Sequence, residues 1–90
     1  MKINHLRLEY PGIYTTITRY TKNPYIVGYL KIMNESINDK NIDDINSCIQ
    51  KLLSWYETNI KKILANEYVM NKEDHIRTRK ILTNAYDTLN

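Results

Sequence analysis

The sequence predicts a mainly α-helical single domain. It consists of three helices, of which the central one is long, and a separate short N-terminal unit. Two observations lead to this prediction. The 90 residues, 42% of them hydrophobic, are enough for one compact domain with its own core. Apolar residues also recur with a helical period over long stretches, interrupted by only two glycines and two prolines.

The central helix is predicted over residues 41–66, where apolar side chains follow each other every three or four positions. The stripe consists of Ile42, Ile45, Ile49, Leu52, Tyr56 and Ile63, with Leu53, Ile60 and Leu64 at its margins. Asn41 is suited to cap the helix, and Asp43 and Asp44 place negative charge in its first turn. Such a helix is about 36 Å long, so we expect it to run the length of the domain.

Two shorter helices are predicted on either side of it. The first covers residues 23–38, because Asn23 can cap a helix whose first residue is Pro24. Its apolar face consists of Ile26, Leu30, Met33 and Ile37. Gly28 in its middle indicates either a bend or the close approach of another backbone. The second covers residues 71–89, and its inner face consists of Thr78, Leu82, Ala85, Tyr86 and Leu89.

Residues 1–22 fit two structures. Alternating apolar residues, the Pro11-Gly12 pair and a following run rich in Thr, Ile and Tyr are typical of a β-hairpin with a type II turn. Ile13, Ile17 and Tyr20 also fit one face of a short helix. The pattern does not decide between hairpin and helix.

The composition restricts the class of protein. With Cys48 as the only cysteine, no disulfide within the chain and no cysteine-based zinc site can form, which favours a reducing, cytoplasmic setting. No apolar run approaches the roughly 20 residues that cross a bilayer, and the N-terminus does not resemble a secretory signal. We therefore expect no membrane association, and no cofactor or metal.

Catalytic chemistry is not expected either. His5 and His75 are the only histidines, and no spacing of His, Asp and Glu resembles a metal site. Asp74 and His75 are neighbours on a helix, so their side chains diverge, and an exposed, capped helix start explains them better. Cys48 lies among apolar residues and is expected to fill the core. We therefore predict that the protein is not an enzyme.

The residue types that recognise partners gather in the N-terminal third and on the central helix. The predicted partner-binding residues are Arg7, Tyr10, Tyr14, Arg19, Tyr20, Lys22, Tyr25 and Trp55. The same basic, tyrosine-rich surface could contact phosphates and stack on bases, with further nucleic-acid contacts from Arg77, Arg79 and Lys80. The wide apolar face of the central helix is also compatible with a homodimer.

These features lead to a functional hypothesis. We expect a small non-catalytic protein that regulates or inhibits a larger partner, either a protein or a protein–nucleic acid complex. The small size and the bias toward Asn, Ile, Lys and Tyr suit a phage or mobile-element accessory protein, such as an inhibitor of a host defence nuclease of the anti-CRISPR type. The alternative is a nucleic-acid-binding regulator that uses the basic, tyrosine-rich N-terminal surface.

Overall fold

The computed structural model describes residues 2–65 and 72–89, and within them every regular element is a helix. The helices are α1 (Ile3–Tyr20), α2 (Pro24–Asn38), α3 (Ile42–Ala65) and α4 (Lys72–Thr88). The prediction of a mainly α fold is confirmed. The predicted count of three helices is wrong, because the N-terminal unit is a fourth helix of 18 residues.

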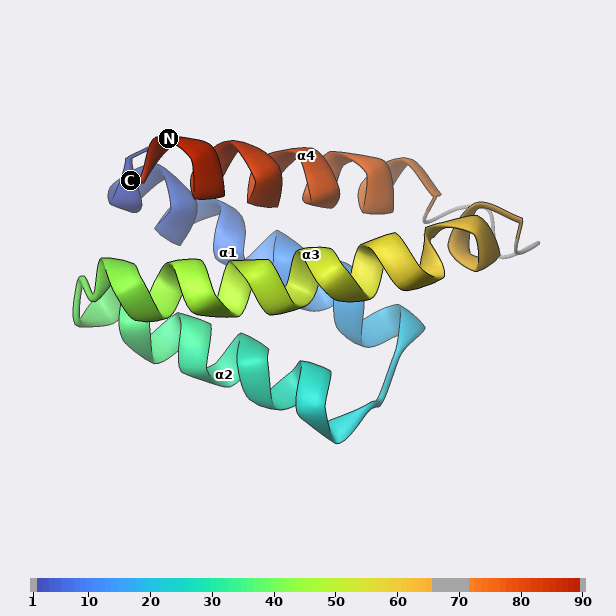
Figure 1. The fold of residues 1–90 in the computed structure, drawn as a ribbon, viewed down its shortest axis with the longest axis horizontal. Coiled ribbons are helices and arrows are strands. Elements are labelled where there is room, and N and C mark those ends of the chain that lie inside the picture. Colours follow the sequence, from blue (N-terminus) through green and yellow to red (C-terminus); the bar gives the residue numbers. More distant parts are fainter. Residues whose placement is uncertain (1, 66–71, 90) are drawn as a thin grey trace.

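The four helices form an antiparallel bundle in which each packs on two others (Figure 1). α2 packs on α1 and α3, and α4 packs on α3 and α1. The start of α1 and the end of α4 lie at the same end of the bundle (Figure 1). The molecule measures 38 × 24 × 20 Å, and α3 runs along most of its longest dimension.

α3 supplies the largest share of the core. Its buried side chains are Ile45, Cys48, Ile49, Leu52, Tyr56 and Ile63. Leu53, Trp55 and Ile60 are partly buried and pack against the same core. The predicted range of 41–66 exceeds α3 by one residue at each end, and residue 66 lies outside the described part of the chain. The predicted start of the last helix, at residue 71, also lies outside the described part.

The N-terminal residues form a helix and not a hairpin. Of the two alternatives, the hairpin with a turn at Pro11-Gly12 is wrong, because both residues lie inside α1, and the helix is confirmed. Pro11 has no N–H to donate to a carbonyl in the preceding turn, so it weakens the helix locally. Burial of apolar side chains one turn apart offsets this loss, since only a helix places them all on one face. These side chains are Leu6, Ile13 and Ile17, each at most 1% exposed.

The space around Gly28 is open. It lies inside α2, and a Cβ atom built on it would meet no heavy atom within 4 Å. Of the two interpretations of Gly28, the close approach of another backbone is therefore wrong.

The connection between α2 and α3 is a hydrogen-bonded turn. The Lys40 N–H donates to the Ile37 carbonyl at 3.2 Å, and the Asn41 N–H donates to the Ser36 carbonyl at 2.9 Å. This is the Schellman pattern that ends many helices, and it requires a left-handed residue at the position of Lys40. Lys40 has a φ of 56°. The Asn41 side chain then caps α3 by accepting the Asp44 N–H at 3.2 Å, as predicted.

Replacing Lys40 by glycine should stabilise the fold. A non-glycine residue in the left-handed region costs about 1–2 kcal/mol, part of which is offset by the greater entropy of glycine in the unfolded chain. We expect Lys40→Gly to raise the free energy of unfolding by about 0.5–1 kcal/mol, measured by urea denaturation. Lys40→Ala is the matched control, because it removes the charge and keeps the Cβ. An equal gain in both variants would contradict the explanation by backbone strain.

Candidate functional site

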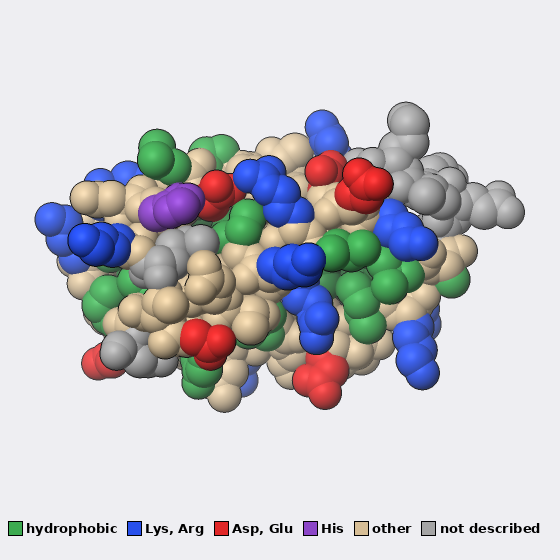
Figure 2. Space-filling view, turned by 90° about the horizontal axis from the view of Figure 1, so that it is seen from above, with side chains coloured by type: hydrophobic (Ala, Val, Ile, Leu, Met, Phe, Trp, Pro, Cys, Tyr) green, Lys and Arg blue, Asp and Glu red, His purple; other side chains and the backbone are tan. Residues whose placement is uncertain are grey.

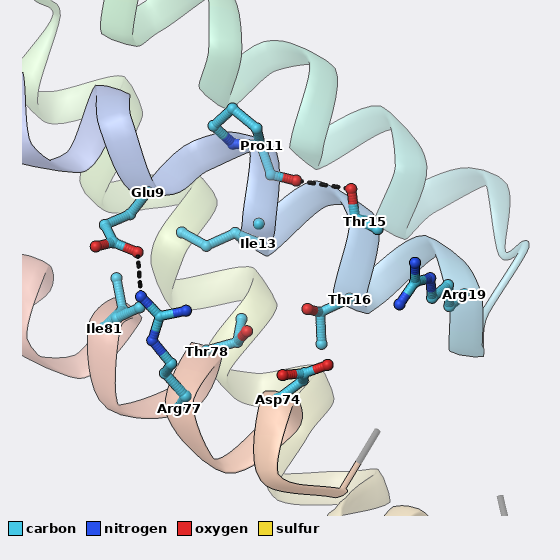
Figure 3. Close-up of a pocket in the computed structure, with 11 residues that line it drawn as sticks. Glu9, Pro11, Ile13, Thr15, Thr16, Arg19, Asp74, Arg77, Thr78 and Ile81 are labelled. Atoms are coloured by element: carbon cyan, nitrogen blue, oxygen red, sulfur yellow. Dashed lines mark hydrogen bonds and ion pairs between the residues drawn. The ribbon is translucent and has the colours of Figure 1, made fainter. Parts of the chain in front are cut away.

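A polar groove lies between α1 and α4 (Figure 3). Its volume is about 350 Å³, which is within the range of small ligand sites. It is lined by Glu9, Pro11, Gly12, Ile13, Thr15, Thr16 and Arg19 of α1 and by Asp74, Arg77, Thr78 and Ile81 of α4.

The spacing of the lining residues explains why the groove exists. On α1 they recur at positions 9, 12, 16 and 19, and on α4 at positions 74, 77 or 78, and 81, so each helix presents one face to the groove. Several of these residues are small. Gly12, Thr16 and Thr78 cannot fill the space between the two helix backbones, which leaves a hollow above the core.

One end of the groove is bridged by an ion-pair network centred on Glu9. Arg77 Nη2 of α4 lies 3.2 Å from Glu9 Oε2, and His5 Nε2 lies 3.6 Å from Glu9 Oε1. The His5 contact is an ion pair only when His5 is protonated. These side chains are largely exposed except for Glu9, so the network contributes little to stability. It holds the Arg77 guanidinium against α1.

The other end of the groove contains polar groups that are not paired with each other. Within the described residues, Arg19 and Asp74 lie on opposite walls and neither forms an ion pair. Thr16 lies between them on the floor, is 8% exposed, and its hydroxyl has no hydrogen-bond partner in the same part of the chain. In Figure 3, Thr16 points from α1 toward Asp74 of α4, and Arg19 lies at the same end of the groove.

An aromatic cluster joins α1, α3 and α4, and two of its four rings are buried. The rings of Tyr20 (α1), Trp55 and Tyr56 (α3) and His75 (α4) pack edge to face, with centroid distances of 4.8–6.0 Å. Tyr56 is fully buried and His75 is 1% exposed. The Tyr56 hydroxyl lies 3.0 Å from His75 Nδ1, so this bond ties α3 to α4.

The environment keeps both members of this pair neutral. Burial lowers the pKa of His75, although the nearby Asp74 carboxylate partly opposes the shift. Burial also raises the pKa of Tyr56, although a hydrogen bond with Thr78 partly opposes that shift. When Thr78 donates to the Tyr56 oxygen, the Tyr56 hydroxyl is free to donate to His75 Nδ1. The His75 proton is then on Nε2.

The structure distributes the eight predicted partner-binding residues over several places. Arg7 and Tyr10 join α1 to α2, because Arg7 Nη2 donates to the Ile37 carbonyl at 3.2 Å and Tyr10 Oη donates to the Leu30 carbonyl at 2.6 Å. Burial raises the pKa of Tyr10 to about 12. Tyr20 and Trp55 belong to the aromatic cluster.

The remaining four predicted residues reach the surface. Arg19 lines the groove, and Lys22 Nζ donates to the Thr18 carbonyl at 2.9 Å at the end of α1. Tyr14 contacts the ring of Tyr10 and is 38% exposed, whereas Tyr25 is 77% exposed at the start of α2. The eight residues therefore do not form a single patch.

The three residues of α4 predicted to contact nucleic acid also separate. Arg77 takes part in the Glu9 network, whereas Arg79 and Lys80 line a different shallow hollow together with Thr83, Asn84 and Asp87. The face seen in Figure 2 carries both basic and acidic side chains, and several of the basic ones lie next to each other near its centre.

His75 is the main residue that sequence reasoning placed wrongly. An exposed helix start was expected for the segment around it, and Glu73 and Asp74 are indeed exposed, but His75 is buried. A signal was present, because His75, Thr78, Leu82 and Ala85 follow each other at intervals of three and four on the buried face of α4. Cys48 is buried in the core, as predicted.

The described residues were also compared with the requirements of a metal site and of a membrane-spanning helix. Among residues 2–65 and 72–89, no three His, Cys, Asp or Glu side chains are grouped so that they could hold a metal ion. None of the helices described is both long enough and apolar enough to span a membrane.

Removing the Tyr56 hydroxyl should destabilise the bundle. In Tyr56→Phe the ring and its packing remain, but His75 Nδ1 is left buried without its partner. An unsatisfied buried polar group costs about 1–3 kcal/mol, so we expect a loss of that size in the free energy of unfolding. Tyr14→Phe, which removes an exposed hydroxyl, is the control. Equal stability of Tyr56→Phe and the wild type would contradict a structural role for this bond.

Acidification should destabilise the protein through His75. Because the pKa of His75 is lowered in the folded state, the unfolded chain takes up the proton first. The contribution of neutral His75 is complete above the unfolded pKa of about 6.5 and is lost as the pH falls through the folded value.

Denaturant titrations at about pH 7 and pH 5 measure this dependence. We expect His75→Gln to flatten it and Asn84→Gln, at an exposed and uncharged position of the same helix, to leave it unchanged. The same pH dependence in the wild type and His75→Gln would refute the assignment.

No protein-family model and no solved structure matches the chain. Among curated proteins, it is similar to an uncharacterised protein, YddK, of Bacillus subtilis (strain 168), with 25% identity over 87 residues. The match covers 97% of this chain and 33% of the relative. The chain therefore spans about a third of the length of the curated protein that it matches.

Proposed function

We propose that this chain is a non-catalytic binding protein that regulates or inhibits a larger protein or protein–nucleic acid complex, as an accessory protein of a phage or mobile element. The observation that carries the proposal is the α1–α4 groove, which is lined at one end by Arg19, Asp74 and Thr16 and in which neither Arg19 nor Asp74 forms an ion pair within the described part of the chain. A concave site with a few convergent polar groups is typical of a binding surface.

The charges around this groove favour a protein partner over nucleic acid. A phosphate backbone is held by a continuous series of cations. Here Glu9 and Asp74 lie between the basic residues, and Arg77 is already paired with Glu9. A protein surface, which carries both signs, fits this alternation better.

Exposed apolar side chains on α1 and α2 also support a protein partner. Leu8 of α1 is 80% exposed and Tyr25 of α2 is 77% exposed. Tyrosine is among the residue types that contribute most to binding at protein interfaces. An isolated exposed leucine is ordinary on a protein surface, so Tyr25 is the stronger of the two indications.

A nucleic-acid-binding regulator is the second candidate. It is favoured by the position of Arg19 and Lys22, which are both exposed near the end of α1, and by the exposed rings of Tyr14 and Tyr25. Cations combined with accessible aromatic rings are the elements of single-strand binding.

Binding measurements with generic DNA and RNA at low and moderate salt separate the two candidates. We expect weak binding that disappears at moderate salt and that Arg19→Glu with Lys22→Glu reduces no more than the matched control Lys61→Glu with Lys62→Glu. The control changes the net charge equally on exposed positions of α3. Tight, salt-sensitive binding that only the Arg19 and Lys22 variant abolishes would reverse the ranking.

A partner search completes the test. We expect the tagged chain to retain a specific protein from nuclease-treated host lysate, and Tyr25→Ser or Asp74→Asn to weaken that retention. If the retained material is nucleic acid, or if the nuclease treatment removes every retained protein, the proposal of a protein partner is wrong.

A further inference from the structure

We propose that the α1–α4 groove binds a polypeptide segment that presents a carboxylate and a cationic group side by side. This rests on the proposed function in one respect, namely that the partner is a protein. It adds the binding site and the chemistry that the site recognises.

The size of the groove restricts its occupant. Its volume is about 350 Å³, near the lower end of the range for small-ligand pockets. A pair of side chains fits this space, whereas a whole helix, about 10 Å across, does not. The occupant is therefore a short element that projects from a partner surface.

The polar side chains at one end of the groove determine which ligand groups it can bind. Arg19 offers several N–H donors in a planar fork that suits a carboxylate. Asp74 offers only acceptors on the opposite wall, which suits an ammonium or guanidinium group. Thr16 also lines the groove, and its hydroxyl can donate to a ligand there or accept from it.

The balance of charge excludes ligands of a single sign. Two acidic and two basic side chains line the groove, so its formal charge is zero. A purely anionic ligand at Arg19 lies near the Asp74 carboxylate, and a purely cationic ligand at Asp74 lies near the Arg19 guanidinium. Only a ligand with both signs forms favourable contacts on both walls. Glu9 and Arg77 neutralise each other at 3.2 Å and leave Arg19 and Asp74 as the contact groups.

The test uses blocked dipeptides as probes. The ¹⁵N-labelled chain is titrated with N-acetyl-glutamyl-lysine amide, with the corresponding diglutamyl and dilysyl compounds, and with free glycine, and the amide shifts are followed by NMR. We expect the mixed-charge dipeptide to give saturable shifts at Thr16, Arg19 and Asp74, and the two single-sign dipeptides to give weaker ones.

Variants assign the effect to the two walls. Arg19→Gln and Asp74→Asn should each raise the dissociation constant of the mixed-charge dipeptide about fivefold, as expected for loss of one exposed ion pair. Arg79→Gln is the control, because Arg79 is exposed on α4 and lies outside the groove. Circular dichroism confirms that each variant remains folded.

The outcomes separate this proposal from the proposed function. No shifts in the groove, or equal binding of the single-sign dipeptides, overturns the proposal. If free glycine binds as tightly as the mixed-charge dipeptide, the occupant is not a polypeptide segment, and the groove is assigned to a small zwitterion. If a protein partner still binds an Arg19→Gln, Asp74→Asn double variant with unchanged affinity, the groove assignment fails while the proposed function remains. If the wild type retains no protein partner, the proposed function itself fails.

Discussion

The structure depends on burying the wide apolar face of α3, which no single neighbouring helix can cover. Ile45, Ile49, Leu52 and Tyr56 are all completely buried, and they are covered by α2 on one side and by α4 on the other. Each fully buried aliphatic side chain contributes roughly 1.5–3 kcal/mol relative to an exposed one, so this face accounts for much of the favourable free energy of folding. The short turn at residues 39–41 and the bond between Tyr56 and His75 keep α2 and α4 in position against it.

Because α2 and α4 occupy two sides of α3, α1 has a defined place between them. On the α2 side, it is attached by hydrogen bonds from Arg7 and Tyr10 to backbone carbonyls. On the α4 side, it is attached by the exposed ion pair of Glu9 and Arg77 and by the edge-to-face contact between the rings of Tyr20 and His75, and small residues such as Gly12 and Thr78 lie between these two contacts. The groove thus lies where small side chains of α1 and α4 face each other, and its lining includes both charged and hydroxyl-bearing side chains.

Much of the fold could be predicted from the sequence, and the site could not. The period of the apolar residues around Leu52 and the capping residues Asn23 and Asn41 are local signals that need no tertiary information. The choice between helix and hairpin for α1 depends on whether α2 and α4 offer a surface for Ile13 and Ile17, which is a tertiary property. The groove brings together residues 9–19 and 74–81, and the Tyr56–His75 bond spans 19 residues, so neither is visible in a single sequence window.

Native-state hydrogen exchange tests the central role of α3 most directly. If the other helices assemble around α3, the amides of residues 49–56 should exchange only by global unfolding and give the highest protection free energies in the chain. The amides of α1 beside the groove, around Gly12 and Thr16, should exchange through smaller openings. Slower exchange in α1 than in the middle of α3, or exchange of the α3 amides well below the global free energy of unfolding, would contradict this account.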